Sequence, residues 1–379
     1  MIERIPEGSK RAFERTSHPY YFYEVLMDVP EGLQKILQPS EYAMIKECAQ
    51  VLHSKKVAYL IGNGTSLYDA EGAVPMFNEH TSLVTVAMPA YEFVAYPPNK
   101  MDDESCLIIV SHSGNTPEGI NALKYAKEKG VTTMVLSDNK DGKMLSMADY
   151  AIVTDLDEPQ MPKSRCFIAS LLRVHLLALE CAKLEGKSTD DLIAQYLEVP
   201  ALAQKIIDEN EAKIKAYAEA RAKDDLARVV VLGTGFQYGP VRESSLKFVE
   251  GALVYSEAWE MEEFLHGPMY SMKPNELLIV NAIAGSSFAK SRLIVSGIRK
   301  LSSNTWAITN TTDELEGADF VTVLPQGLPE SMYALFTPMV AYLFVYYYSV
   351  SLGRNHIDHG PYASQDFMDA RWVLRQIEK

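Results

Sequence analysis

The chain contains a long internal repeat, which constrains its fold more than any other feature. The segment Val57-Ala-Tyr-Leu-Ile-Gly-Asn-Gly is matched by Val229-Val-Val-Leu-Gly-Thr-Gly at an offset of 171 positions (233 minus 62). Met147-Ala-Asp-Tyr is matched by Gly317-Ala-Asp-Phe at an offset of 170 (318 minus 148). Because two landmarks agree within one residue, the second half of the chain is predicted to duplicate the first.

Each half alternates short apolar runs with helical stretches, the pattern of parallel βαβ units. The strands predicted in the first half are Val57–Ile61, Leu83–Val86, Cys106–Val110, Thr133–Leu136 and Tyr150–Val153. Helices are predicted over Met44–Leu52, after Ser66, and over Pro117–Lys129. The predicted fold is therefore α/β, with two tandem doubly wound parallel-sheet domains related by duplication.

The repeat also predicts how the chain divides. We expect an N-terminal arm over 1–40, a first domain over 41–186, a helical connector over 187–226, a second domain over 227–352 and a tail over 353–379. The aromatic run Tyr20–Tyr23 is expected to pack the arm on its own domain or on a partner subunit. Ala334–Leu352 is apolar enough to suggest a membrane span, but the repeat aligns it with Cys166–Leu184 and so predicts a core helix.

Composition excludes some classes of function. The net charge is -14 and no basic stripe is present, which argues against nucleic acid as a partner. The four cysteines lack paired spacing, and Met1–Lys10 lacks the apolar core of a signal peptide. We therefore expect a cytoplasmic protein with reduced thiols and no membrane partner.

Two polar turns in the first half each follow a predicted strand and open a predicted helix. The turn 111–116 reads Ser-His-Ser-Gly-Asn-Thr, and its three hydroxyls with the helix amides suit a dianionic phosphate. An ordinary helix start capped by Thr116 is the alternative. The turn 62–66 reads Gly-Asn-Gly-Thr-Ser; a dinucleotide-binding turn would have a third glycine where Leu67 stands.

The second half supplies candidate proton-transfer groups. Glu250 lies seven residues after Glu243, so both could line one face of a helix, and burial would suit Glu250 to move a proton. His266 follows Glu263 by three residues, at the end of a short helix stopped by Gly267-Pro268. A solvated acidic helix with a structural histidine is the alternative interpretation.

These residues resemble the SIS (sugar isomerase) domain family, which includes fructosamine-6-phosphate deglycases and the isomerase half of glucosamine-6-phosphate synthase. The family pattern places a His-Gly-Pro sixteen residues after the glutamate of Leu-Lys-x-x-Glu, as Leu246–Glu250 and His266–Pro268 do here. The resemblance implies that Glu250 transfers a proton between C1 and C2 of an open-chain sugar phosphate. It implies that His266 assists ring opening, often from a neighbouring subunit.

The polar turns resemble the phosphate-binding turns of the same family, with His112 in place of the glutamine common in the synthase. The residues implied to bind substrate are Thr65, Ser66, Ser111, Ser113, Thr116 and, by a looser match, Glu158. Lys163 and Arg165 could help to neutralise the phosphate. The equivalent second-half turn, 282–287, lacks the hydroxyl pattern, so we expect the first copy to hold phosphate and the second to supply the acid and the imidazole.

The tail reads Gly353-Arg-Asn-His-Ile-Asp-His-Gly-Pro-Tyr and lacks the lysine run of the synthase. His356, Asp358 and His359 have no further ligand pair at metal-binding spacing, so no metal and no cofactor are predicted. The chain starts with its own arm, so we expect no glutaminase half.

The resemblance favours a fructosamine (fructosyl amino acid) 6-phosphate deglycase that releases glucose 6-phosphate and an amine through an enaminol. The alternatives are a ketose-aldose phosphosugar isomerase, an amino-sugar-phosphate deaminase, or a non-catalytic sugar-phosphate sensor. The family's shared sites imply a homodimer or a larger homo-oligomer.

Overall fold

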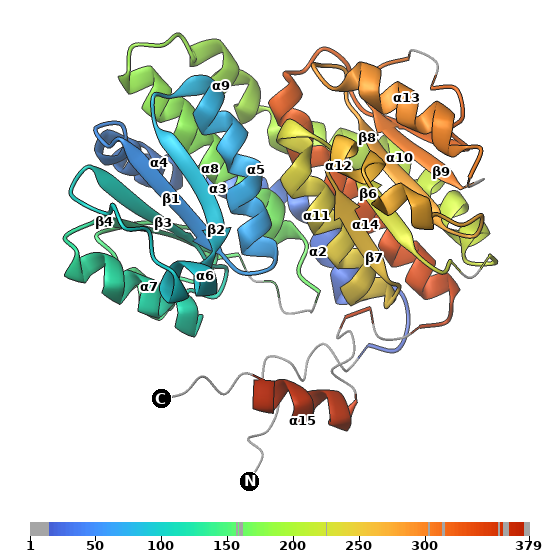
Figure 1. Ribbon diagram of the computed structural model, residues 1–379, viewed down its shortest axis with the longest axis horizontal. Coiled ribbons are helices and arrows are strands. Elements are labelled where there is room, and N and C mark those ends of the chain that lie inside the picture. Colours follow the sequence, from blue (N-terminus) through green and yellow to red (C-terminus); the bar gives the residue numbers. More distant parts are fainter. Residues whose placement is uncertain are drawn as a thin grey trace.

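A computed structural model describes residues 15–374, except 157, 159–161, 225, 302–303, 313–314, 355–356 and 359–363. Two parallel five-stranded sheets with flanking helices lie side by side, one in each half of the chain (Figure 1). The predicted α/β fold with two tandem sheets is confirmed. His356 and His359 of the tail lie outside the described residues.

The first sheet has the order β2-β1-β3-β4-β5, and the second has the order β10-β9-β8-β6-β7. The strands of the first sheet are β1 (Val57–Gly62), β2 (Val84–Pro89), β3 (Ser105–Val110), β4 (Thr132–Ser137) and β5 (Tyr150–Val153). Those of the second are β6 (Val229–Leu232), β7 (Ser256–Trp259), β8 (Leu277–Ala282), β9 (Thr305–Thr309) and β10 (Phe320–Val323). In each half the first strand of the sequence lies between the second and the third, so the two topologies are the same.

Helices cover both faces of each sheet, which is why the central strands are apolar on both faces. Every residue of β3 and of β8 is buried. The helices of the first half are α2 (Tyr21–Met27), α3 (Val29–Ile36), α4 (Pro39–Leu52), α5 (Thr65–His80), α6 (Ala90–Ala95), α7 (Pro117–Glu128) and α8 (Arg165–Leu184). After these come α9 (Asp190–Leu197), α10 (Val199–Arg221), α11 (Tyr238–Lys247), α12 (Met261–Leu265), α13 (Phe288–Ile298), α14 (Tyr333–Ser351) and α15 (Gln365–Leu374).

One hydrophobic core joins the two halves, and helices α8 and α14 lie at its centre. Glu330–Ser351 is long and apolar enough to cross a bilayer, but 89% of its apolar window is buried inside the protein. It packs against α10 and α11, as the repeat predicted for a core helix. Within the described residues, the four cysteines are free and buried, as expected.

The aromatic run of the N-terminal arm packs on α14 of the same chain. The Phe22 ring stacks on Tyr346 at 6.3 Å between centroids. The amides at the start of α2 are satisfied by Asp358, whose carboxylate accepts from Tyr21 N at 2.8 Å and from Phe22 N at 2.7 Å. The arm therefore contacts its own chain. The division of the chain into the five segments given above stays a prediction.

Helices α5 and α11 form the joint between the halves, and the joint depends on two glycines. A Cβ atom on Gly239 of α11 would lie 2.4 Å from the carbonyl oxygen of Tyr68 and 2.7 Å from the amide of Gly72, both on α5. No side chain fits in that space, so the two backbones meet directly. The joint brings the start of α5 against the end of α11.

Candidate active site

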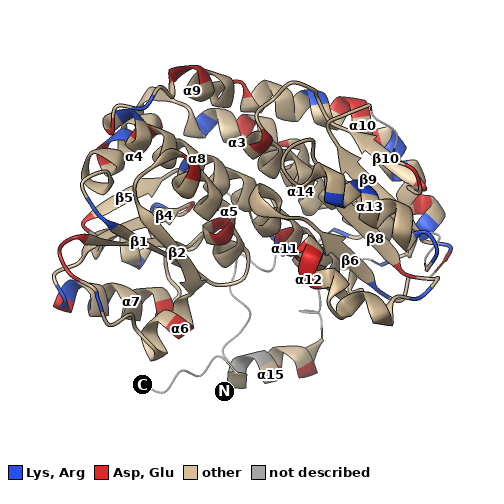
Figure 2. Ribbon diagram, turned by 45° about the horizontal axis from the view of Figure 1, so that its top comes forward, with Lys and Arg blue, Asp and Glu red and all other residues tan. Residues whose placement is uncertain are grey.

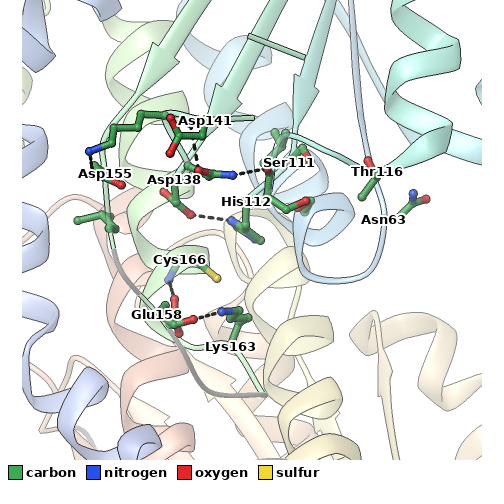
Figure 3. A pocket seen from close by; sticks show the side chains of 16 residues that line it. Asn63, Ser111, His112, Thr116, Asp138, Asp141, Asp155, Glu158, Lys163 and Cys166 are labelled. Atoms are coloured by element: carbon green, nitrogen blue, oxygen red, sulfur yellow. Dashed lines mark hydrogen bonds and ion pairs between the residues drawn. The ribbon is translucent and has the colours of Figure 1, made fainter. Parts of the chain in front are cut away.

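A cavity of about 640 Å³ lies at the carboxyl ends of the first-half strands (Figure 3). Open α/β sheets bind their ligands at this edge. The cavity is lined by five of the residues that the sequence predicted to bind substrate, namely Ser66, Ser111, Ser113, Thr116 and Glu158. Asn63, His112 and Lys163 line it as well.

The turn 111–116 is held in shape by its backbone and by the loop after β4. Gly114 has a φ of +62°, and a Cβ on it would lie 2.8 Å from the Cα of Gly142. Asn139 Nδ2 donates to the carbonyl of Ser113 at 2.9 Å. The Ser111 hydroxyl is buried and makes no hydrogen bond with any described residue, so it is available to a ligand.

Thr116 stands at the N-cap position of α7, before Pro117, as predicted. Its hydroxyl makes no capping bond with the described part of the chain. The capping alternative therefore accounts for its position along the chain but not for its hydroxyl.

The turn 62–66 brings the first residues of α5 to the cavity. Gly64 has a φ of +56°, and a Cβ on Gly62 would lie 2.5 Å from the backbone of Ser66. Ser66 lines the cavity, whereas Thr65 does not. The Thr65 hydroxyl instead accepts a hydrogen bond from Lys247 Nζ at 3.3 Å, across the joint between the halves.

Glu158 caps the core helix of the first half. Its carboxylate accepts hydrogen bonds from Ser164 N at 2.5 Å, Arg165 N at 3.2 Å and Cys166 N at 3.0 Å. Burial alone would raise its pKa, but Lys163 and the helix amides lower it. Glu158 is thus an ionised cap that also lines the cavity.

Of the two basic residues considered for phosphate, Lys163 lines the cavity. Arg165 is buried and forms an ion pair with Asp28 instead. The expectation that Arg165 faces the phosphate is therefore wrong.

Glu250 differs from its predicted environment. Its side chain is 31% exposed, and the fully buried carboxylate is Glu243, whose pKa is raised by burial. Helix α11 ends at Lys247, and Glu250 lies in a π-helical turn over Phe248–Ala252. The prediction is corrected in two respects: the two glutamates do not lie on one regular helix, and Glu250 is only partly buried, although both carboxylates contact Lys247.

Lys247 connects Glu250 to the cavity. It is fully buried, and its Nζ lies 2.6 Å from Glu250 Oε2 and 3.1 Å from Glu243 Oε1. The same nitrogen bonds Thr65, the neighbour of the cavity residue Ser66. Two successive bonds, from Glu250 to Lys247 and from Lys247 to Thr65, thus join the predicted base to the polar turn.

His266 lies away from this cavity in its own chain. It is the C-cap of α12, its side chain is 70% exposed, and its Nε2 lies 3.2 Å from Glu262 Oε1. The acidic residues of α12 form a red segment on the surface of the second half in Figure 2. The contribution of His266 to a neighbouring subunit's site stays a prediction.

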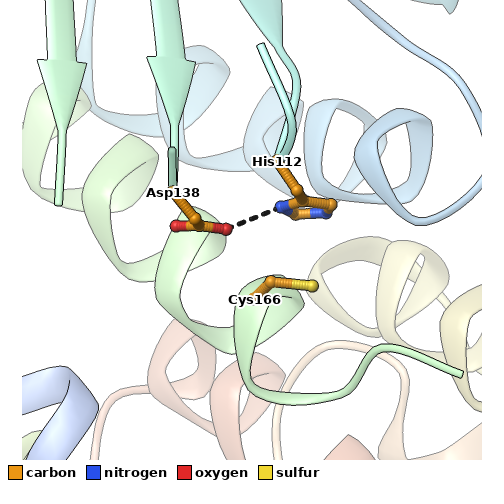
Figure 4. A group of neighbouring side chains, drawn as sticks. All are labelled: His112, Asp138 and Cys166. Carbon is orange, nitrogen blue, oxygen red and sulfur yellow. Dashed lines mark hydrogen bonds and ion pairs between the residues drawn. The ribbon is translucent and has the colours of Figure 1, made fainter. Parts of the chain in front are cut away.

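The cavity also contains a buried pair that the sequence did not indicate. His112 Nδ1 lies 2.9 Å from Asp138 Oδ2 (Figure 4). Asp138 also forms an ion pair with the fully buried Arg173. Burial alone would raise the pKa of Asp138, but Arg173 and His112 lower it. Cys166 offers a third atom within 4.8 Å of the pair. Because Arg173 and His112 both bind Asp138, these three residues form a hydrogen-bonded relay.

Two sequence signals could have identified this relay. Asp138 directly follows a strand, at the edge of the sheet where ligands bind. Arg173 is a cation in the otherwise apolar run Phe167–Leu179 and needs a buried partner there.

The equivalent turn of the second half contains a carboxylate of the protein itself. A Cβ on Gly285 would lie 2.1 Å from Glu330 Oε2, so the glutamate occupies the space above the turn. Burial raises the pKa of Glu330, and a hydrogen bond from the backbone of Ser286 opposes that rise. The predicted difference between the two turns is therefore also a difference in what fills them.

Comparison with known proteins finds similarity to one domain family and to one group of enzymes. The SIS domain model matches residues 51–179. Glutamine–fructose-6-phosphate aminotransferase [isomerizing] of Methanococcus maripaludis is 23% identical over 346 residues, which cover 90% of this chain and 56% of that protein. The enzyme of the same name from Methanocaldococcus jannaschii is 24% identical, with 90% of this chain and 30% of that protein covered. The chain thus spans about half, or less, of these relatives.

Solved structures share the fold. The C-terminal domain of glucosamine-fructose-6-phosphate aminotransferase from Francisella tularensis aligns with a TM-score of 0.78 at 19% identity, covering 89% of this chain and 98% of that one. Tagatose-6-phosphate ketose/aldose isomerase from Escherichia coli gives 0.74 at 17%, covering 89% and 94%. Glucosamine-6-phosphate deaminase from Thermotoga maritima gives 0.72 at 20%, covering 90% and 98%.

The two polar turns lie within the segment that the family model matches, and most of the chain aligns with the aminotransferases. The chain is therefore similar to SIS domain proteins over residues 51–179 and is related in sequence to the isomerizing glutamine–fructose-6-phosphate aminotransferases.

Proposed function

We propose that this chain is a phosphosugar enzyme that binds the substrate phosphate at the turn 111–116 and transfers a proton with Glu250. The observation that carries the proposal is the pair of bonds from Glu250 through Lys247 to Thr65. These bonds tie the carboxylate of the second half to the turn 62–66 of the first half, whose Ser66 lines the cavity.

The phosphate end of the site is supported by its donors. Ser111, Ser113 and Thr116 line the cavity with Ser66, and helices α5 and α7 begin beside it, so the positive ends of their dipoles favour an anion there. Lys163 adds the cationic side chain that the overall negative charge of the protein does not provide. Hydrogen bonds to an ionised phosphate are about twice as strong as neutral ones, so a few such donors suffice.

Glu250 has the surroundings of a base. Lys247 Nζ lies 2.6 Å from its carboxylate and fixes its position, and partial exposure leaves the carboxylate accessible to a substrate. Glu250 would remove a proton from C1 of the open-chain sugar while the C2 carbonyl oxygen gains a proton, giving an enaminol or an enediol.

The finer assignment that we propose is deglycation of a fructosyl amino acid 6-phosphate. Reprotonation of the enaminol at C2 leaves an imine at C1, and water then releases the amine and glucose 6-phosphate. His266, 70% exposed on one subunit, would open the sugar ring in a neighbouring subunit, so the active form would be a dimer or larger.

A phosphosugar isomerase or an amino-sugar-phosphate deaminase is the second candidate. The names of the structural neighbours from Escherichia coli and Thermotoga maritima favour it. In an isomerase the proton taken from one carbon returns to the other without loss of an amine. A sensor that binds the sugar phosphate without turnover is the third.

One assay distinguishes these candidates. The protein is incubated separately with fructose 6-phosphate, glucosamine 6-phosphate and the α- and ε-fructosyl amino acid 6-phosphates, and the products are identified. Glucose 6-phosphate formed from a fructosyl amino acid supports the deglycase. Interconversion of free sugar phosphates, or loss of ammonia from glucosamine 6-phosphate, supports the second candidate. Binding without any product supports the sensor and rules out the enzyme.

A further inference from the structure

A fully buried carboxyl group, Asp69 on α5, lies between the phosphate turn and the joint that holds Glu250. Neither of its oxygens has a hydrogen-bond partner among the described residues. Its Oδ2 lies 3.8 Å from His112 Nε2, and that nitrogen is itself buried and unpartnered within the described chain. Two complementary polar groups thus face each other, and the distance between them exceeds the length of a hydrogen bond by less than one ångström.

The proton positions in this pair follow from the neighbouring bonds. His112 Nδ1 faces the ionised Asp138, so Nδ1 carries a proton and Nε2 of the neutral ring presents a lone pair. Burial, with the carboxylates of Glu243 and Asp138 nearby, raises the pKa of Asp69 well above its usual range. Asp69 therefore has an O–H group that faces the lone pair of Nε2.

Charged and titratable groups from several elements face Asp69. They are Glu243 and Lys247 of α11, Arg173 of α8, Tyr342 of α14, and His112 and Asp138 after β3 and β4. Lys247 matters most for catalysis, since the ammonium that holds Glu250 also acts on Asp69. A change of charge at Asp69 is thus felt at the proposed base.

We propose that a phosphate group bound at the turn 111–116 transfers the proton of Asp69 to His112. The O–H bond of Asp69 breaks, an N–H bond forms at Nε2, and Asp69 becomes a carboxylate while His112 becomes an imidazolium. The total charge of the cluster is unchanged. This inference rests on the proposed function only in taking the turn as the phosphate site.

The transfer benefits both ends of the site. The imidazolium, in the middle of the turn, attracts the dianionic phosphate. The new carboxylate at Asp69 competes with Glu250 for Lys247, which frees Glu250 to act as a base. Asp69 is thus a positioning residue, and it makes the base more reactive once the phosphate is bound.

Calorimetry with the full chain tests the proton balance. Glucose 6-phosphate, a monoester that is dianionic at pH 8, is titrated into the protein in two buffers of different ionisation enthalpy. We expect binding with no proton taken up from the buffer, and 15N-histidine spectra in which His112 changes from neutral to doubly protonated. Uptake of one proton, or a His112 that stays neutral at saturation, overturns the inference. Failure of the ligand to bind overturns the phosphate assignment itself.

Asp69→Asn gives the second test, because an amide cannot supply the proton. At pH 8 we expect affinity for glucose 6-phosphate to fall about tenfold. We expect the kcat of Asp69→Asn to fall as well, whereas Ser113→Ala weakens binding alone. Asp190→Asn makes the same substitution at an exposed residue of α9 and should have neither effect. An unchanged affinity at pH 8 contradicts the inference, and the wild-type titration decides it should Asp69→Asn not fold.

Discussion

The two halves of the molecule share one topology but fill the same turn with different groups. In the first half the turn 111–116 opens to a cavity, and Lys163 precedes the core helix. In the second half Glu330 stands at the same place before its core helix and lies above Gly285. The surrounding sequences, Pro162-Lys163-Ser164 and Pro329-Glu330-Ser331, differ only at the middle residue. A duplicated anion site can therefore be kept in one copy and replaced by an internal carboxylate in the other.

The two core helices, α8 and α14, also differ in polarity, with the polar groups in the first half. Helix α8 buries Arg173 and His175, which bond Asp138 and the backbone of Gly72. Helix α14, over 333–351, contains no charged residue and no histidine, and its tyrosines and phenylalanines pack together. The first half thus retains polar groups beneath its cavity, while the second half stabilises the fold with aromatic packing.

The largest expected effect tests the division of labour between the halves. Glu250→Gln removes the proton acceptor and leaves the phosphate turn intact, so kcat should fall by about 100- to 10,000-fold with little change in ligand affinity. Steady-state kinetics and calorimetric titration measure the two effects separately. Glu219→Gln, on the exposed face of α10, is the matched control. Turnover that persists in Glu250→Gln would remove this residue from the mechanism.

The next largest expected effect compares ligand binding at the turn 111–116 with binding at the equivalent turn 282–287. The double variant Ser113→Ala/Thr116→Val removes two donors to the phosphate, and at about 1.5 kcal/mol for each bond to a charged group the Kd should rise about a hundredfold. Ser286→Ala/Ser287→Ala makes a similar change in the turn of the second half and should leave the Kd unchanged. Equal losses in both double variants would show that the second turn also binds ligand.

A third prediction concerns the polar core of the first half. Burial lowers the pKa of His175 to about 3, from the 6.5 of a histidine in water. Between these two pKa values the unfolded chain binds a proton that the folded chain excludes. The contribution of His175 to the free energy of unfolding is therefore fully present above pH 6.5 and is lost as the pH falls. The loss between pH 7 and pH 5 should be about 2 kcal/mol from this group.

Urea unfolding at the two pH values measures that loss. In His175→Gln the dependence on pH should weaken by about 2 kcal/mol, whatever the variant's stability at pH 7. His53→Gln changes a partly exposed histidine and should leave the dependence as it is. A dependence that is the same in all three proteins would contradict the buried, neutral state of His175.

The smallest effect concerns the carboxylate in the second turn. Glu330→Ala leaves the backbone of Ser286 without its acceptor, which should lower the free energy of unfolding by about 1 kcal/mol. Urea unfolding at pH 7 measures it, with the exposed Glu316→Ala as the control. An increase in stability would mean that burial of the carboxylate outweighs its hydrogen bond.

Much of the fold could be predicted because the apolar periods of the strands are local signals and the repeat supplied each of them twice. Strands β3 and β4 begin and end within one residue of the predicted bounds. Helix α4 begins at Pro39, five residues before the predicted start, because proline takes the first helical position.

The polar turns could also be predicted, since glycines and hydroxyls cluster within six residues of sequence. The relay of Asp138, His112 and Arg173 was missed, because its members lie up to 61 positions apart (173 minus 112) and meet only through tertiary packing; the charge of Arg173 in a mostly apolar run was the signal that it needs a buried partner. The predicted burial of Glu250 on a regular helix was wrong for another reason. A π turn interrupts the helix at this residue, and periodicity alone does not reveal such an interruption.

The meeting of α5 and α11 at Gly72 and Gly239 has a consequence for how this scaffold can change. The spacing of the two halves is set where main chain touches main chain, because a side chain on Gly239 would collide with the backbone of α5. A substitution of Gly239 must therefore move the halves relative to each other. If the proposed site is right, adaptation to longer or shorter substrates is expected in the loops after the strands rather than at this joint.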